Sequence, residues 1–173
     1  QNNMKLLFIS LGCDKNLVDS EEMLGMLAAD GHEIVDDEDE AEVIIVNTCC
    51  FIGDAKEESV NTILEMAEKK KAGTCKVLIV TGCMAQRYKK EISEEIPEVD
   101  AILGTTSYGD ISKAVKEAQA GRHFEEYKSI DFLPDISGKR MLTTGGHFAY
   151  LKIAEGCDKH CTYCIIPRLR GGY

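Results

Sequence analysis

The sequence predicts an α/β fold: a three-layer domain in which helices cover both faces of a parallel sheet. Short runs rich in Val, Ile and Leu alternate with longer, charged segments of helical periodicity. The helical segments are long enough to serve as the crossovers that parallel strands require. With 44% hydrophobic residues in a length of 173, the chain can also bury a sizeable core.

Each element is predicted from its apolar pattern and its flanking residues. Strands are expected at residues 4–11, 32–35, 43–46, 76–81 and 101–103. Helices are expected at residues 17–29, 57–71, 85–94 and 107–120. Asn16 or Asp19 is suited to cap the first helix. The second helix should turn Ile63 and Leu64 inward.

The pattern divides the chain into three parts. Residues 4–124 are expected to form the first domain, with Met4 as the native start after three foreign residues. Residues 125–146 hold several turn formers and are predicted to be a linker. Residues 147–173 should begin a second domain that is truncated at the end of this chain. Its first strand is expected at residues 148–154.

The composition and net charge of the chain indicate where the protein is located and which classes of partner it can bind. No apolar run approaches the ~20 residues of a membrane span, and no signal peptide is evident, so we expect a cytoplasmic protein with reduced cysteines. The net charge is −10, and six acids fall within residues 36–42. We interpret that run as a solvated turn, with a docking surface for a basic partner as the alternative. No basic stripe suggests that this chain grips nucleic acid.

Cys157, Cys161 and Cys164 have the spacing C-x3-C-x2-C on one short segment. Three thiolates can hold three corners of a four-iron cluster, which leaves the fourth iron open to a small molecule. The spacing is that of radical S-adenosylmethionine enzymes. The alternative is a structural zinc loop with His160 as the fourth ligand. An electron-transfer protein would instead need four ligands for each cluster, and no fourth cysteine is well placed.

Cys13, Cys49 and Cys83 form a second, widely spaced set, with intervals of 36 and 34 residues. Each follows a predicted strand, and the carboxyl ends of parallel strands meet at one edge of a sheet, where ligands gather. We therefore predict a shared metal site, with three separate loop or core cysteines as the alternative.

The other two cysteines and two nearby amides have open roles. Cys75 begins a predicted strand and is expected to be an ordinary buried residue. Cys50 is either a bystander, a substitute ligand or a thiol beside the site. Asn16 and Asn47 either donate hydrogen bonds to metal-bound sulfur or serve loop and helix-cap geometry.

Taken together, the motifs resemble those of the radical S-adenosylmethionine methylthiotransferases. The resemblance rests on the segments LGCDKNLVDSE at residues 11–21, NTCCFI at 47–52, TGCMAQR at 81–87 and EGCDKHCTYCIIPRLRG at 155–171. The opening and the N-T-C-x-F-I segment resemble the branch that modifies an aspartate of the twelfth small-subunit ribosomal protein. Asp14 stands where proline is common, and Cys50 where a small residue is usual.

The resemblance implies a TIM-like radical S-adenosylmethionine barrel after the first domain, and two 4Fe-4S clusters, one on each cysteine set. S-adenosylmethionine would bind the open iron at the second set, with Tyr163 near its adenine; plain packing is the other role for Tyr163. Arg168 and Arg170 would approach the carboxylate of the cofactor or of the substrate, or would be structural salt-bridge or surface residues.

The resemblance also implies partners. They are a small-subunit ribosomal protein as substrate and an electron donor such as flavodoxin or ferredoxin, with no membrane involved. Most of the barrel lies outside these 173 residues, so this chain is expected to be inactive alone. The alternatives are a transfer-RNA adenosine methylthiotransferase, the only case with a nucleic-acid partner, and a zinc-stabilised interaction module.

Overall fold

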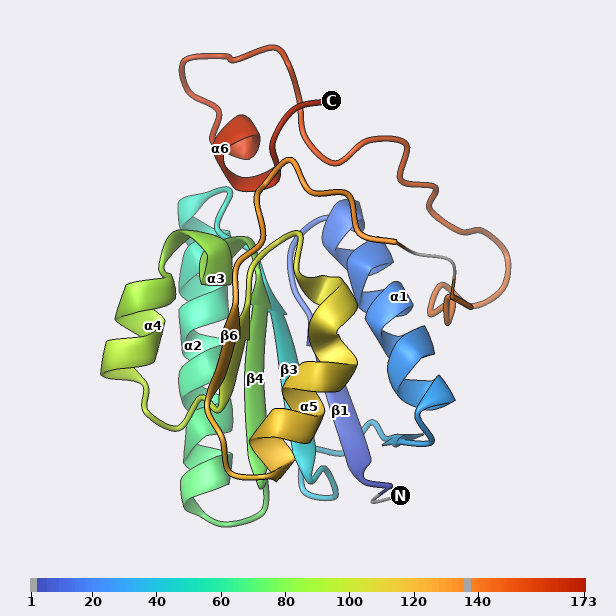
Figure 1. The fold of residues 1–173 in the computed structure, drawn as a ribbon, viewed down its shortest axis with the longest axis vertical. Helices are drawn as coiled ribbons and strands as arrows, with labels where there is room; N and C mark the ends of the chain where they lie inside the picture. Colours follow the sequence, from blue (N-terminus) through green and yellow to red (C-terminus); the bar gives the residue numbers. More distant parts are fainter. Residues whose placement is uncertain (1–2, 136–137) are drawn as a thin grey trace.

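The computed structural model describes residues 3–135 and 138–173, and its centre is a six-stranded parallel sheet (Figure 1). The strands lie in the order β2-β1-β3-β4-β5-β6. Their bounds are Lys5–Ser10 for β1, Glu33–Ile34 for β2, Val43–Thr48 for β3, Val77–Gly82 for β4, Ala101–Leu103 for β5 and Phe124–Glu126 for β6. The predicted α/β class and parallel sheet are confirmed.

Helices cover both faces of the sheet, as expected of a parallel sheet buried on two sides. Their bounds are Asp14–Ala29 for α1, Gly53–Lys71 for α2, Cys83–Arg87 for α3, Lys89–Glu95 for α4 and Ile111–Gln119 for α5. One core cluster joins the sheet to α1 and α5 through residues such as Met23 and Val115. The other joins the opposite face to α2 and α3 through Ile63 and Met84.

The register brings three strand ends to one edge. Ser10 of β1 pairs with Asn47 of β3, and Thr48 of β3 pairs with Gly82 of β4. The chain leaves all three strands at this edge. The residues that follow β1, β3 and β4 therefore lie beside one another.

Several predicted helix boundaries are wrong in detail. The first helix begins at Asp14, so Asn16 and Asp19 lie inside it and do not cap it. The segment predicted as one helix at residues 85–94 is two helices, because Tyr88 leaves helical geometry at φ −118° and ψ 32°. Leu64 is 47% exposed, contrary to the prediction, whereas Ile63 is buried as predicted, together with Met66 and Ala67.

The C-terminal third differs most from the prediction. Strand β6 was not expected, and it extends the sheet beyond residue 124. The strand expected at residues 148–154 is wrong: this segment has no regular structure, and Leu151 is 83% exposed. A strand needs a neighbour to take its backbone hydrogen bonds, and no strand of the described residues pairs with it. The division into residues 4–124, 125–146 and 147–173 stays a prediction.

Residues 127–135 and 138–173 instead lie across the end of the sheet and include the short helix α6, Ile166–Arg170 (Figure 1). They lie at the end where the strands leave the sheet. No helix of the described residues is long and apolar enough to cross a membrane. The acidic turn at residues 36–42 is largely exposed and pairs with lysines, including Lys5 with Glu40 and Lys69 with Asp39.

Candidate functional site

Cys13 lies in the turn between β1 and α1. Gly12 precedes it with φ +89°, a conformation that favours glycine. A Cβ atom on Gly12 would lie 2.7 Å from the sulfur of Cys49. The absence of a side chain at Gly12 is therefore what allows the first two cysteine turns to approach each other.

Cys49 directly follows β3 and is 5% exposed. Its backbone is held by Ser59 of α2, whose hydroxyl accepts from the Cys49 N–H at 3.0 Å and donates to the Cys49 carbonyl at 2.8 Å. Helix α2 thus fixes the second cysteine through the backbone and leaves its sulfur free of this contact.

Cys83 is the first residue of α3, directly after β4. Gly82 turns the chain with φ +94°, and a Cβ atom there would lie 2.4 Å from the Asn47 side-chain oxygen. Burial raises the pKa of the Cys83 thiol to about 12, against the opposing influence of Arg170. In the metal-free chain this sulfur therefore keeps its proton at neutral pH.

The three cysteines line one cavity of about 520 Å³, which we call the N-terminal cysteine pocket. The other lining residues are Gly12, Asp14, Lys15, Phe51, Ile52, Ala55, Ile166, Leu169 and Arg170. The predicted convergence of the three strand-end cysteines is thus present as a shared pocket. Among the described residues, however, no three His, Cys, Asp or Glu side chains stand in an arrangement that would hold a metal ion.

The chemistry of the pocket nevertheless fits an iron-sulfur group. Three thiols face one cavity, and the close approach over Gly12 would be blocked by any side chain. Soft thiolate ligands are the donors that iron-sulfur clusters use. The assignment of Cys13, Cys49 and Cys83 as ligands stays a prediction.

Asn16 ties the three cysteine turns together. Its side-chain nitrogen donates to the Leu11 carbonyl at 3.0 Å and to the Thr48 carbonyl at 2.8 Å, and its side-chain oxygen accepts from the Cys83 thiol at 3.9 Å. Asn47 donates to the Asn16 carbonyl and to Ser20. The hypothesis that these amides donate to sulfur is therefore wrong for this structure, because their N–H groups hold backbone and hydroxyl oxygens.

The second cysteine set lies on an irregular loop before α6. Cys157 donates its N–H to the Gly171 carbonyl at 3.1 Å, and Cys164 donates its N–H to the Cys161 carbonyl at 3.0 Å. His160 has φ +46°, which bends the loop between the first two thiols. The structure therefore closes the loop through its backbone.

Cys161 and Cys164 line a cavity of about 390 Å³, the C-terminal cysteine pocket. Its other lining residues are Phe51, Arg87, His160, Thr162, Tyr163, Ile165, Pro167 and Arg168. Cys157 does not line it. Tyr163 is 88% exposed, so it has no packing role within the described residues. Its predicted place near an adenine, and the ligand role of the three cysteines, stay predictions.

The two pockets adjoin. Phe51 lines both, and α6 contributes Ile166 and Leu169 to one and Pro167 and Arg168 to the other. The sequence separates the two cysteine sets by more than 70 residues, but the fold places them on either side of one short helix.

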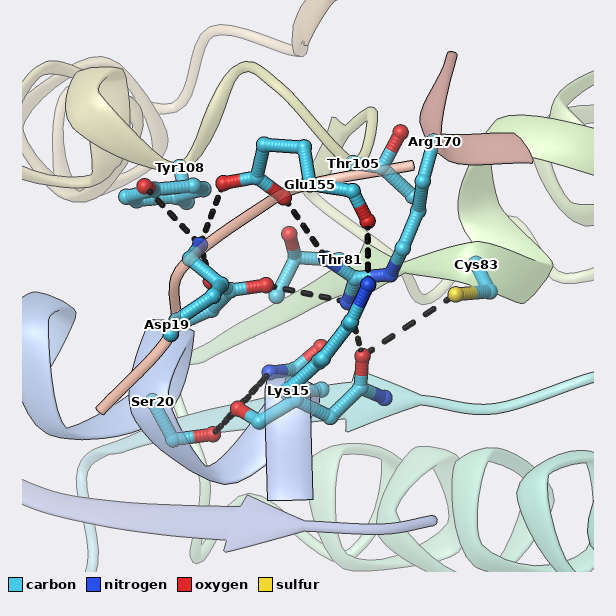
Figure 2. Close-up of polar contacts among 12 residues, drawn as sticks. Lys15, Asp19, Ser20, Thr81, Cys83, Thr105, Tyr108, Glu155 and Arg170 are labelled. Carbon is cyan, nitrogen blue, oxygen red and sulfur yellow. Dashed lines mark hydrogen bonds and ion pairs between the residues drawn. The ribbon is translucent and has the colours of Figure 1, made fainter. Parts of the chain in front are cut away.

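Arg170, which lines the N-terminal cysteine pocket, belongs to a buried ionic cluster (Figure 2). Its guanidinium lies 3.0 Å from Asp19 and 3.0 Å from Glu155. Lys152 pairs with the same two carboxylates and lies near the Tyr108 hydroxyl. Burial raises the pKa of Asp19, and the two cations oppose that change. Of the two roles considered for Arg170, the salt-bridge role is confirmed.

The sequence contains a signal for this buried cluster. Asp19 lies one helical turn before the apolar Met23, and Lys152 lies within an apolar run. Charged residues in such positions need partners if they are buried. Arg168, in contrast, is exposed, and Cys50 and Cys75 are buried in the core cluster that includes Ile44 and Leu78.

Comparison with known proteins places the chain in a family. The model of the uncharacterized protein family UPF0004 matches residues 5–104, a span that contains Cys13, Cys49 and Cys83. The chain belongs to the UPF0004 family. This UPF0004 chain is 63% identical over 170 residues to the "Ribosomal protein uS12 methylthiotransferase RimO" of Lachnoclostridium phytofermentans.

Relatives with the same name in Clostridioides difficile and Trichlorobacter lovleyi are 52% and 50% identical over 170 residues. Each alignment covers 98% of this UPF0004 chain, but only 39%, 38% and 38% of the respective relatives. The chain thus spans about two fifths of the length of these relatives. The names confirm the resemblance to methylthiotransferases that the cysteine motifs predicted.

Proposed function

We propose that this chain provides both cysteine sites of a methylthiotransferase that modifies an aspartate β-carbon of the ribosomal protein uS12. The observation that carries the proposal is the pair of adjoining pockets, one lined by three strand-end cysteines and the other by Cys161 and Cys164. The names of the relatives support the same substrate. A net charge of −10 also suits a basic ribosomal protein better than a polyanionic RNA.

The proposed cofactors are two 4Fe-4S clusters and S-adenosylmethionine. When bound, these groups supply the radical and sulfur chemistry that amino-acid side chains cannot perform. Cys13, Cys49 and Cys83 would hold one cluster. Cys157, Cys161 and Cys164 would hold the other, where three ligands leave a position open for S-adenosylmethionine.

The residues of the chain itself position and enclose these sites. Asn16 and Ser59 hold the backbone of the turns that carry the cysteines. The cysteines are therefore already positioned before a cluster binds. Phe51 is 51% exposed between the two pockets and offers an apolar wall to both. Tyr163, on the rim of the C-terminal cysteine pocket, is available to stack on an adenine.

Iron and sulfide counts test the cofactor part of the proposal. We expect about eight irons per chain after anaerobic reconstitution, since each of two four-iron clusters has its own cysteine set. The Cys13→Ala and Cys157→Ala variants should each retain about four irons per chain. Cys75→Ala is the matched control, because Cys75 is buried away from both pockets. Zinc without sulfide would instead indicate a structural module.

A chimera tests the substrate part. In it, this chain replaces the corresponding 39% of the Lachnoclostridium phytofermentans relative. Incubation with S-adenosylmethionine, a low-potential reductant and purified uS12 should produce a methylthio group on one aspartate, read by peptide mass spectrometry. A methylthio group found on transfer RNA and not on uS12 would contradict the proposal.

A further inference from the structure

Arg170 is a buried cation that the C-terminal segment inserts into the N-terminal cysteine pocket. It is 3% exposed and lines the cavity together with Cys13, Cys49 and Cys83. It lies in α6, whereas the three cysteines follow β1, β3 and β4. The N-terminal cysteine pocket is therefore incomplete without residues that lie more than 80 positions further along the chain.

The position of Arg170 is fixed by two carboxylates. Asp19 of α1 and Glu155 of the preceding loop each lie 3.0 Å from its guanidinium, and Lys152 shares both carboxylates (Figure 2). Two cations and two anions are thus buried together. Hydrogen bonds at two of its nitrogens hold the planar guanidinium in one orientation, which a flexible ammonium group would not achieve.

Arg170 and Cys83 both contact the side-chain oxygen of Asn16. The side-chain oxygen of Asn16 lies 2.5 Å from Nη2 of Arg170 and accepts from the Cys83 sulfur at 3.9 Å. A cysteine that binds metal has lost its proton and can no longer donate to Asn16. Arg170 then remains as a positively charged donor on the same Asn16 oxygen that the Cys83 sulfur contacts.

We propose that Arg170 is a positioning residue of the N-terminal cysteine site. It holds Asn16, and through Asn16 the Cys83 turn, and its charge favours negative charge on the Cys83 sulfur. The consequence is a physical coupling between the two cysteine sets: the first is complete only when the loop that carries the second is docked on α1. The redox part of this inference rests on the proposed cluster at Cys13, Cys49 and Cys83.

The test measures a reduction potential rather than turnover. All variants are made in the Cys157→Ala chain, in which a single cluster would remain at the N-terminal cysteines. This chain is the parent for comparison. Arg170→Gln removes the positive charge beside the cluster, so its reduced form should become about tenfold less favourable, or ~59 mV for one electron. Arg170→Lys keeps the charge and should restore most of the potential. The potential is followed by electron paramagnetic resonance during a mediated titration.

Arg140→Gln is the matched control. Arg140 also joins the C-terminal half to α1, through Glu21, but it does not line the N-terminal cysteine pocket. It should leave the potential unchanged. Loss of iron from Arg170→Gln while Arg140→Gln stays loaded would support the positioning role. An unchanged potential in Arg170→Gln, or an equal change in Arg140→Gln, would overturn the inference.

A second measurement needs no metal. The N–H groups of Gly156 and Cys157 bond to the Gly172 and Gly171 carbonyls, so they report whether the loop that carries Arg170 stays closed. Their hydrogen exchange should accelerate in Arg170→Gln, while the amides of β3 and β4 stay protected. If the Cys157→Ala parent binds no iron, the proposed function fails. Unchanged exchange in Arg170→Gln would then still overturn the positioning role.

Discussion

At the scale of single residues, the site depends on two positions that contribute no thiol. Gly12 allows the Cys13 turn to pass over Cys49, and Asn16 joins the turns after β1 and β3 to Cys83. Neither residue would be chosen from a search for ligands. Both are needed because three turns must meet at one place without steric or polar conflict.

Gly12→Ala should weaken the N-terminal site more than it weakens the fold. The added Cβ would lie 2.7 Å from the Cys49 sulfur, in a backbone conformation that costs a non-glycine residue about 1–3 kcal/mol. We expect a matching loss in urea unfolding and a loss of about four irons on reconstitution. Gly53→Ala is the control, since nothing lies within 4 Å of a Cβ there. Full iron loading of Gly12→Ala would contradict this role.

Asn16→Ala should destabilise the whole chain. It leaves the Leu11 and Thr48 carbonyls without their side-chain donor, and each unsatisfied buried group costs about 1–3 kcal/mol. We therefore expect a loss of about 2–4 kcal/mol in the free energy of unfolding, measured with urea. Asn61→Ala, on the exposed face of α2, should change little. Equal stability of the two variants would show that the amide contacts are not important.

At the scale of elements, α1 combines core packing with buried acidic residues, which is unusual for a surface helix. It packs Met23 and Leu27 into the core, yet it also buries Asp19 and Glu21. Glu21 accepts from the N–H and hydroxyl of Thr143 and pairs with Arg140. Helix α1 is thus the surface on which the C-terminal half is docked, in addition to its role in the three-layer core.

The Glu21 contacts predict an acid sensitivity. Burial alone would raise the pKa of Glu21, but the hydrogen bonds from Thr143 and Arg140 outweigh it, so the pKa lies below its ordinary value of 4.5. Its contribution to stability is therefore complete above pH 4.5 and is lost as the pH falls through the lowered pKa. Hydrogen exchange of residues 140–144 should rise over that range.

Glu21→Gln separates this group from the other carboxylates. It should cost about 1.5–3 kcal/mol at neutral pH, the value of hydrogen bonds to a charged group, and should reduce the acid dependence of exchange in residues 140–144. Glu58→Gln, exposed on α2, is the comparison. An acid response that is the same in both variants would assign it to other groups.

At the scale of the whole molecule, the chain consists of a well-packed sheet domain and a C-terminal segment held mainly by polar contacts. Residues 147–165 contain no helix or strand, and Leu151 and Ile153 are largely exposed. The buried charges of Lys152 and Arg170 provide the attachment. We expect this segment to be released at a lower free energy than the sheet.

Lys152→Met tests the attachment. It leaves Asp19 and Glu155 with one cation instead of two, and breaking a buried ion pair costs on the order of 3 kcal/mol. Hydrogen exchange at residues 152–157 should accelerate, with β3 and β4 unaffected. Lys159→Met, on the exposed part of the cysteine loop, should behave like the parent. Slow exchange in Lys152→Met would mean that Arg170 alone is sufficient.

The sequence by itself determined the α/β class, the approximate strands and both cysteine sets. Apolar periodicity and ligand spacing are local properties, so they can be read along the chain. The convergence of Cys13, Cys49 and Cys83 could also be predicted, because the carboxyl ends of parallel strands lie at one edge of the sheet. The strand register places the three cysteines there.

Only the tertiary structure decided the rest. It paired β6 with β5, left residues 148–154 without a strand, and placed Arg170 of the C-terminal segment beside Cys83. These features depend on which distant groups can satisfy a buried charge or a backbone hydrogen bond. Such partners are chosen by proximity in the folded chain. A local pattern can show that a buried charge needs a partner, but it does not show which distant residue supplies it.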